Sequence, residues 1–377
     1  MASSASPPFA ALLLTFTLAC GGGGGSGGGG GAGGEAGGTG GTSACGEADL
    51  GACEYESQGL SVTVREGFSV TDAITGRELP LLARIPEGAG PFPVVVWSHG
   101  GGFNQGGQRF SPEWGDALAS HGYVVIHIAH IPVTPESGAA LCELGAIPAG
   151  ECSAAETEED TTGLLALVKT RDTIAVLDAL PDLSAASVDM GGPAIDLERV
   201  AIAGWSAGAR APMVTHGAVF LPSPSAPALS MTHPLPKAAI ALSPMGPGYA
   251  GFFDEPSSNT WEAMRGPVLV ATGNNDIKPD KPDVSGEDRR LAFERQPADG
   301  SRWLLFSTLE PQVGGHSTYN LEDLESSDER LARLSLSLRS SALAFLDANL
   351  KGDEAAQAWL ASQNAQTLAG AAEWAHR

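Results

Sequence analysis

The sequence predicts an α/β protein with a mostly parallel central sheet covered by helices on both faces. From residue 93 onward, short apolar runs alternate with segments of helical periodicity. Strands that are apolar throughout are typical of parallel sheets, because helices cover both of their faces. Ahead of this region, three stretches alternate apolar and polar residues between Gly and Pro, which predicts an antiparallel N-terminal edge over 60–66, 68–75 and 79–86.

The parallel part contains the remaining expected elements. Its strands are expected at 94–98, 123–129, 200–203, 238–242, 268–272 and 303–308. Its helices are expected at 112–120, at 163–180, directly after Ser206, around Trp261, at 287–296 and at 328–349. Two segments interrupt the alternation: a solvated, disulfide-looped insertion over 134–160, and a Pro-rich stretch over 221–236 that is either part of a lid or a surface loop.

The composition limits the classes of partner. The chain has 377 residues, of which 42% are hydrophobic, so it can bury a sizeable core. It carries 44 acidic against 21 basic residues, a formal net charge of -23. Such a charge disfavours binding to nucleic acid and electrostatic docking on anionic lipid. We expect an acid-rich, solubilising surface and a monomer with no nucleic-acid partner.

The N-terminus predicts export. Residues 9–19 form an apolar run too short to span a bilayer, followed by Cys20 and an almost pure glycine tract over 21–41. This resembles a bacterial lipoprotein signal, which implies a signal peptide over 1–20, lipidation of Cys20, a Gly-rich tether over 21–44 and a single folded domain over 45–377. No Lys or Arg precedes the apolar run, and Thr17 replaces the usual leucine. The alternative is a secreted or periplasmic protein without the anchor, whereas an anchored one would contact a membrane only there.

The other cysteines predict disulfides and no metal site. They are even in number, as expected of an exported protein: Cys45, Cys53, Cys142 and Cys152. Of the three possible pairings we favour the two local ones, each closing a small loop. No cysteine pair has zinc-finger spacing and no H-E-x-x-H occurs, while His127 and His130 face opposite sides of a strand. We therefore expect neither a metal nor an organic cofactor.

A candidate nucleophile lies between a strand and a helix, in the G-x-S-x-G motif of residues 204–208. A serine on a very sharp strand-to-helix turn has a strained backbone and leaves no room for side chains two positions away, which explains Gly204 and Gly208. The hydroxyl of Ser206 is expected to project from the sheet edge above a helix N-terminus. There the helix dipole favours developing negative charge.

A serine nucleophile needs a base, and the base needs an orienting acid. Asp276 follows the strand at 268–272, on the same edge of the sheet as Ser206, and is the expected acid. Asp280 or Asp283 could replace it. His316, in the loop after the strand at 303–308, is the expected base.

An oxyanion formed at Ser206 needs backbone donors as well. Glycines follow the strand at 94–98, and we assign the oxyanion hole to the N–H groups of Gly101, Gly102 and Ala207. His99, directly before the glycines, is expected to pack beneath the loop. A phosphate-binding loop is excluded, because residue 105 is not glycine and no Gly-Lys-Ser/Thr follows.

Residues 92–349 resemble an α/β-hydrolase, and within that superfamily they are most similar to the dienelactone-hydrolase-like and platelet-activating-factor-acetylhydrolase-like esterases. The resemblance lies in PFPVVVWSHGGG, RDTIAVLDAL, DLERVAIAGWSAGA, PVLVATGNND and GGHS. It implies an α/β-hydrolase fold and ester hydrolysis through an acyl-serine intermediate. Trp205 stands where histidine is commoner. A serine nucleophile in place of cysteine argues against dienelactone hydrolase activity itself.

The expected function is therefore that of an exported serine ester hydrolase acting on a small-molecule ester. Phe103 and Tyr249 are expected to line the substrate pocket. Two alternatives stay open: a non-catalytic surface binding module that keeps the hydrolase fold, and an acyltransferase or peptidase that uses the same triad.

Overall fold

The computed structural model describes residues 45–46, 49–152, 163–248, 252–253, 259–277 and 284–377. The expected signal peptide, the lipidation site Cys20 and the glycine tether lie outside the described residues. The described residues from Cys45 onward form one compact unit. Within this part of the chain, no helix has both the length and the hydropathy needed to cross a membrane.

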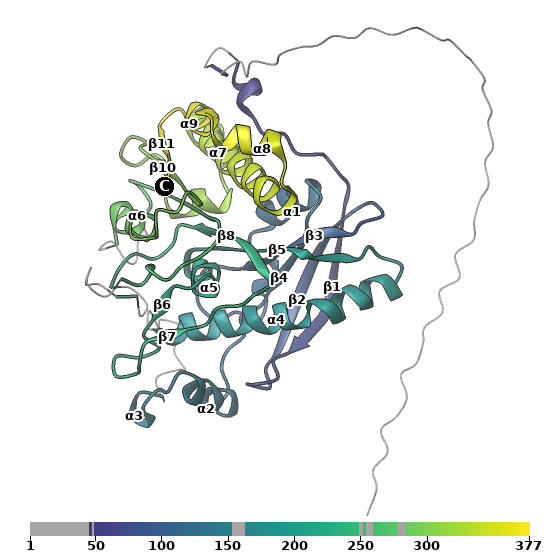
Figure 1. Cartoon of the computed structure of the whole chain (residues 1–377), viewed down its shortest axis with the longest axis vertical. Helices are drawn as coiled ribbons and strands as arrows, with labels where there is room; N and C mark the ends of the chain where they lie inside the picture. Colours follow the sequence, from purple (N-terminus) through teal and green to yellow (C-terminus); the bar gives the residue numbers. More distant parts are fainter. Residues whose placement is uncertain (1–44, 47–48, 153–162, 249–251, 254–258, 278–283) are drawn as a thin grey trace, which may run out of the picture. The chain divides into compact units, whose positions relative to one another are not determined.

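A nine-stranded, mostly parallel sheet forms the centre of the described structure (Figure 1). Across the sheet the strands are β1 (Val62–Thr71), β2 (Glu78–Pro86), β4 (Val124–Ile128), β3 (Phe92–Ser98), β5 (Ile195–Trp205), β8 (Pro236–Leu242), β9 (Val268–Gly273), β10 (Arg302–Ser307) and β11 (Ala372–His376). β1, β2 and β4 pair antiparallel, as do β10 and β11, and the other neighbours pair parallel. The expected α/β class and the antiparallel N-terminal edge are confirmed.

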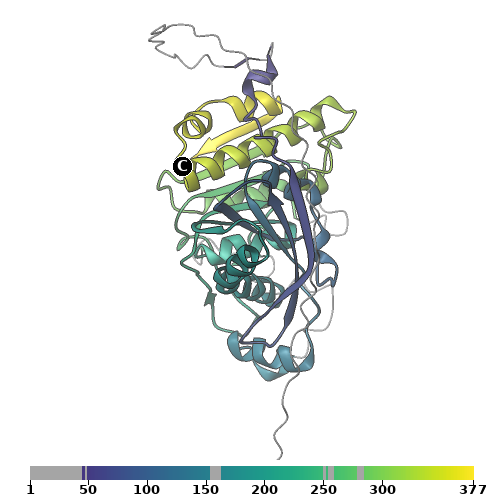
Figure 2. The same cartoon turned by 90° about the vertical axis from the view of Figure 1, so that its right-hand side faces the viewer.

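Helices cover both faces of this sheet (Figures 1 and 2). One face packs on α1 (Pro112–Ser120) and α7 (Glu329–Leu346), the other on α4 (Gly163–Asp189), α5 (Arg210–Thr215) and α6 (Gly286–Glu294). Side chains alternate between the faces along each strand. In β3, Val95 and Trp97 join the core of α1 and α7, whereas Val94 and Val96 join the core of α4.

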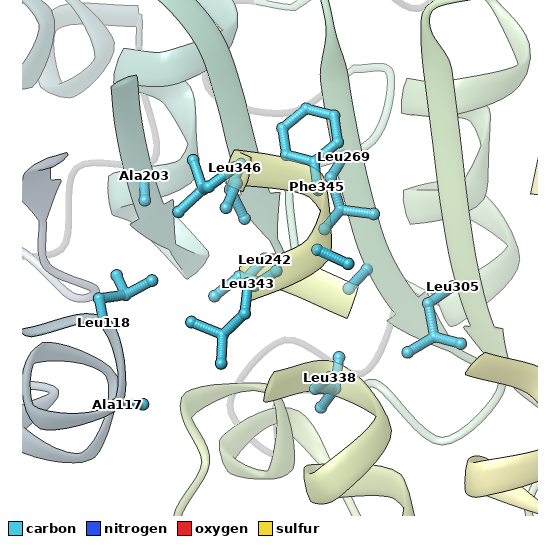
Figure 3. Close-up of a cluster of buried hydrophobic side chains, with 14 of the residues drawn as sticks. Ala117, Leu118, Ala203, Leu242, Leu269, Leu305, Leu338, Leu343, Phe345 and Leu346 are labelled. Carbon is cyan, nitrogen blue, oxygen red and sulfur yellow. The ribbon is translucent and has the colours of Figure 1, made fainter. Parts of the chain in front are cut away.

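The core beneath α7 shows why the strands are apolar throughout. Figure 3 shows Leu343 and Leu346 of α7 facing side chains from four neighbouring strands, namely Ala203, Leu242, Leu269 and Leu305. All of these side chains are buried. Each buried leucine stabilises the fold by roughly 1.5–3 kcal/mol, so the helix and the strands hold each other in place.

Several boundaries differ from the sequence prediction. The stretches 60–66 and 68–75 merge into one strand, β1, with a register irregularity between Arg65 and Phe68. The strand ends at Thr71, and residues 73–75 form a turn. Gly67, with φ of +82°, takes up this irregularity as a bulge and not as a turn. α4 continues through Pro181 to Asp189, because Leu183 packs on the same core as the preceding turns.

Other elements were not predicted or were predicted wrongly. The described part of the 134–160 insertion holds two helices, α2 (Pro135–Leu144) and α3 (Ala149–Cys152), and buries Leu141. Trp261 is buried in a turn and not in a helix. Beyond α7 come a π-helical turn (Asp347–Lys351), α8 (Glu354–Leu360), α9 (Asn364–Ala369) and β11, a region that the short apolar runs did not reveal. Within the Pro-rich stretch, β7 (Leu229–Ser230) pairs with β6 (Val219–Phe220), and β8 begins at the last residue, Pro236.

Two disulfides join Cys45 to Cys53 and Cys142 to Cys152, which confirms the two local pairings. Disulfides persist in oxidising compartments, so they indicate an extracellular or periplasmic protein.

Candidate active site

The turn after β5 has the strained geometry expected of the G-x-S-x-G motif. Ser206 has φ of +55°, in the left-handed region that non-glycine residues rarely adopt. A Cβ at Gly204 would lie 2.4 Å from the carbonyl oxygen of Gly208, and one at Gly208 would lie 2.0 Å from the carbonyl oxygen of Ser98. Only glycine fits at either position. The crowding that the sequence predicted is therefore present.

The structure brings Ser206, His316 and Asp276 into one hydrogen-bonded chain, here named the elbow chain. Nε2 of His316 lies 2.7 Å from Oγ of Ser206, and Nδ1 of His316 lies 2.7 Å from Oδ1 of Asp276. The three residues follow β5, β10 and β9, whose carboxyl ends meet at one edge of the sheet. With a carboxylate at Asp276, Nδ1–H donates to it and Nε2 is free to accept the hydroxyl proton of Ser206.

The carboxylate of Asp276 is completely buried and surrounded by donors. The hydroxyls of Thr272 and Ser243 lie 2.7 Å and 2.6 Å from Oδ2. The guanidinium of Arg289 lies 3.5 Å from Oδ1 and also donates to the backbone carbonyl of Asp276. A buried charge is stable only when its lone pairs are satisfied in this way. These contacts hold the carboxylate at hydrogen-bond distance from His316, where it can orient the imidazole.

Sequence reasoning missed Ser243, which contacts both His316 and Asp276. Its Oγ lies 2.7 Å from Nδ1 of His316 as well as beside both oxygens of Asp276. Ser243 directly follows β8, the strand between β5 and β9, and its φ of +49° places it in the left-handed region. The signal was available: the rule that selected Asp276, a polar residue just beyond the end of a parallel strand, selects Ser243 too.

Trp205 also contacts the histidine. Its indole N–H donates to the backbone carbonyl of His316 at 3.1 Å, and the two ring centroids lie 5.1 Å apart. The indole in turn packs on Gly100, where a Cβ would lie 2.4 Å from the ring. The residue in which the motif departs from the commoner histidine thus positions the expected base.

The glycine loop, residues 99–102, borders this turn. A Cβ at Gly100 would lie 3.3 Å from Cβ of Ser206, so loop and serine are in direct contact. Gly101 has φ of +72° and an open space where a Cβ would stand, whereas Gly102 is half-buried. Ala207 is buried at the start of the helical turn after β5. The assignment of their N–H groups to an oxyanion hole stays a prediction.

His99 packs beneath the loop, as expected. It is 1% exposed, and its Nδ1 lies 2.6 Å from the carbonyl oxygen of Gly100. The backbone N–H of His130 donates to Nε2 of His99, so Nδ1 carries the proton and the ring is neutral. Burial, with a contribution from Lys169, lowers the pKa of His99 well below its usual value.

The substrate side is described only in part. Phe103 is buried in the same apolar cluster as Ala207, together with Met245 and Phe252. Tyr249 lies outside the described residues, as do the alternative acids Asp280 and Asp283. Among the described residues there is no group of His, Cys, Asp or Glu side chains that could hold a metal ion.

Comparison with known proteins assigns no function, so the assignment rests on the geometry of the site. No protein-family model matches the chain, and no curated protein shows significant sequence similarity to it.

Proposed function

We propose that this protein is a serine hydrolase of the α/β-hydrolase fold that cleaves carboxylic esters through an acyl-serine intermediate. The observation that carries the proposal is the single imidazole, of His316, at 2.7 Å from both Ser206 and Asp276. The strained turn between β5 and a helix, and the chain order Ser, Asp, His, support the same fold and mechanism.

The first half of the mechanism forms the acyl-enzyme. Oγ of Ser206 attacks the ester carbonyl carbon while Nε2 of His316 takes the hydroxyl proton. Asp276 keeps Nδ1 protonated and stabilises the imidazolium ion that forms. The oxyanion of the tetrahedral intermediate accepts hydrogen bonds from the N–H groups of the glycine loop and of Ala207. His316 then gives its proton to the leaving alkoxide, and the C–O bond breaks.

The second half releases the acid. His316 accepts a proton from water as that water attacks the acyl-serine, and it returns the proton to Oγ of Ser206 as the carboxylic acid leaves. Ser243 and Trp205 touch His316 throughout, and we assign them the role of positioning residues.

The finer localisation is part of the proposal. We propose that the exported protein is anchored through a lipid on Cys20, with the glycine tract as the tether and with the folded unit acting as a monomer. Incorporation of labelled palmitate by the full chain, lost in Cys20→Ala, would support the anchor. Quantitative release of the protein into the medium with no incorporated lipid would overturn it.

A substrate panel tests the function. The wild type is assayed with aryl and alkyl esters of increasing acyl length, with matched amides, and with an added alcohol as acyl acceptor. We expect ester hydrolysis that Ser206→Ala abolishes and that Ser335→Ala, which alters a buried serine of α7, leaves intact. Preferential amide cleavage or acyl transfer would replace the ester assignment with a peptidase or a transferase. A folded protein without turnover would favour a binding module.

A further inference from the structure

A second chain of Ser, His and Asp side chains begins at Ser98, directly before the glycine loop. Oγ of Ser98 is 2.8 Å from Nε2 of His130, and Nδ1 of His130 is 2.9 Å from Oδ2 of Asp172. Ser98 ends β3, His130 comes two residues after β4, and Asp172 lies on α4. All three are 0% exposed, so no substrate reaches them. We name these residues the inner chain.

Two buried cations accompany the inner chain. The guanidinium of Arg77 pairs with the carboxylate of Asp172, and Lys169 lies one helical turn earlier on α4. Burial raises the pKa of Asp172 to about 7, against the opposing effects of Arg77 and Lys169. Burial also lowers the pKa values of His130 and Lys169 well below their usual ranges. Burying such groups costs free energy unless each of them is well paired.

Those contacts converge on the backbone of the glycine loop. Nζ of Lys169 donates to the carbonyl oxygen of His99 at 2.9 Å. The backbone N–H of His130 donates to the ring of His99, whose Nδ1–H donates to the carbonyl of Gly100. The N–H of Asn104 donates to the carbonyl of His130 at 2.7 Å. The loop is therefore fixed at its start by Lys169 and His99 and just past its end by Asn104.

The same loop is in contact with the turn that carries Ser206. A Cβ at Gly208 would lie 2.0 Å and 2.6 Å from the carbonyl oxygens of Ser98 and His99. The turn that carries Ser206 therefore packs directly on the backbone carbonyls of Ser98 and His99. A shift in those carbonyls would change the position of the loop N–H groups relative to Ser206. A misplacement of about 1 Å is enough to cost roughly 100-fold in rate.

We propose that Ser98, His130, Asp172 and Lys169 form a positioning network that holds the glycine loop where its N–H groups bind the oxyanion formed at Ser206. This inference rests on the proposed function. The network makes no contact with substrate and moves no proton in the reaction. Its effect is on the transition state, because the oxyanion exists only there.

The size of the effect follows from the donors involved. Removing one oxyanion donor outright costs about 100- to 1000-fold in kcat, so loosening the loop that carries such donors should cost about 10- to 100-fold. Ground-state binding of the ester does not use the oxyanion hole, so KM should change less than about twofold. A purely structural network would lower stability without separating kcat from KM in this way.

The experiment compares Ser98→Ala and Lys169→Met with the wild type and with Tyr123→Phe. Tyr123 donates to Asp347 at 2.6 Å in another buried polar cluster, so its variant is a control for the loss of a buried hydrogen bond. Ser98→Ala removes a hydroxyl and adds no atom, so it perturbs folding least. The measurements are kcat and KM on an ester, the Ki of a trifluoromethyl ketone whose hemiketal oxyanion occupies the hole, and the free energy of unfolding.

We expect kcat of both network variants to fall about 10- to 100-fold and the Ki of the ketone to rise by the same factor, with KM unchanged. Tyr123→Phe should keep wild-type kcat and Ki at a comparable loss of stability. Network variants that stay folded with wild-type kcat and Ki would overturn the inference while leaving the proposed function intact. A wild type that hydrolyses no ester and is not inhibited by the ketone would overturn the proposed function itself.

Discussion

The molecule contains two Ser–His–Asp chains with nearly the same hydrogen-bond lengths and with different surroundings. The two distances are both 2.7 Å in the elbow chain, and they are 2.8 Å and 2.9 Å in the inner chain. Ser206 lies on the turn after β5 with a strained backbone, φ of +55°, and is 4% exposed, whereas Ser98 is the last residue of an ordinary strand and is 0% exposed. Hydrogen-bond geometry alone therefore does not identify a catalytic centre, and position on the fold must be added to it.

The charges around the two aspartates differ as well. Asp276 accepts from the hydroxyls of Thr272 and Ser243, with Arg289 at 3.5 Å. Asp172 instead pairs closely with the guanidinium of Arg77, and Lys169 adds a second positive charge nearby. The second setting, around Asp172, keeps its histidine neutral, which suits a positioning role.

The largest predicted difference between the chains is in turnover. Ser206→Ala should lower kcat/KM by roughly 10⁴- to 10⁶-fold, because the nucleophile is lost. Ser98→Ala should lower it only about 10- to 100-fold, since that serine acts through the loop. Steady-state hydrolysis of one activated ester by both variants measures the ratio. Equal losses in the two variants would remove the distinction between the chains.

Replacing the two acids should have different main effects, on turnover for Asp276 and on stability for Asp172. Asp276→Asn should lower kcat by about 10⁴-fold, because the amide favours the wrong tautomer of His316. Asp172→Asn leaves Arg77 as a buried, unpaired charge and should lower the free energy of unfolding by about 3–5 kcal/mol. Denaturant titration and kcat measured on both variants provide the comparison. An Asp172→Asn enzyme with wild-type stability would show that the ion pair with Arg77 contributes nothing.

The sequence was informative where local chemistry dictates structure. The two glycines of the motif and the order of strands and helices predicted the elbow, and the rule for strand ends predicted His316 and Asp276. The inner chain was not predictable, because Ser98, His130 and Asp172 look like ordinary polar residues in apolar segments. Their meeting depends on the packing of α4 against β3 and β4, a long-range contact without a local signal.

Two element boundaries were predicted wrongly for the same reason, namely long-range packing. The sequence predicts two strands, 60–66 and 68–75, on either side of Gly67, yet the sheet accommodates Gly67 as a bulge within β1. The sequence predicts a helix that ends at residue 180, directly before Pro181, yet α4 continues to Asp189 because Leu183 packs on the same core. In both places tertiary contacts outweigh the local preference of one residue.

A smaller effect is expected from the hydroxyl of Ser243, which contacts the elbow chain and has no counterpart among the described residues beside the inner chain. Ser243→Ala removes a donor from the buried carboxylate of Asp276 and should cost about 1–2 kcal/mol, or roughly 10-fold in kcat. The acid limb of the pH–rate profile should move, because Ser243 also contacts Nδ1 of His316. Ser335→Ala serves as the matched control. A Ser243→Ala enzyme with the wild-type kcat and profile would reduce this residue to plain packing.

The smallest expected effect is in the pH dependence of stability. Burial, with added repulsion from Lys169, His99 and Arg77, holds the pKa of His130 well below its usual value of about 6.5. Between about pH 6.5 and pH 5, the unfolded chain therefore binds a proton here that the folded chain does not, and stability falls as the pH falls.

His130→Gln should remove this contribution, so its stability should fall less steeply than that of the wild type, by up to about 1.4 kcal/mol per pH unit. Asp172 changes the pH dependence of stability in the opposite direction in both proteins. Its pKa is raised to about 7, so the folded chain binds a proton there that the unfolded chain does not. Urea titrations at several pH values measure the slopes, with Tyr123→Phe as the control. A slope for His130→Gln equal to that of the wild type would mean that the inner histidine is not held neutral.

The most direct test of the elbow chain as the catalytic one is labelling by a fluorophosphonate, followed by peptide mapping with mass spectrometry. The folded wild type should carry one adduct, on Ser206, with none on Ser98, and Ser206→Ala should not react. A folded wild type that stays unlabelled, or a Ser206→Ala variant that labels equally well, would contradict the assignment of the nucleophile.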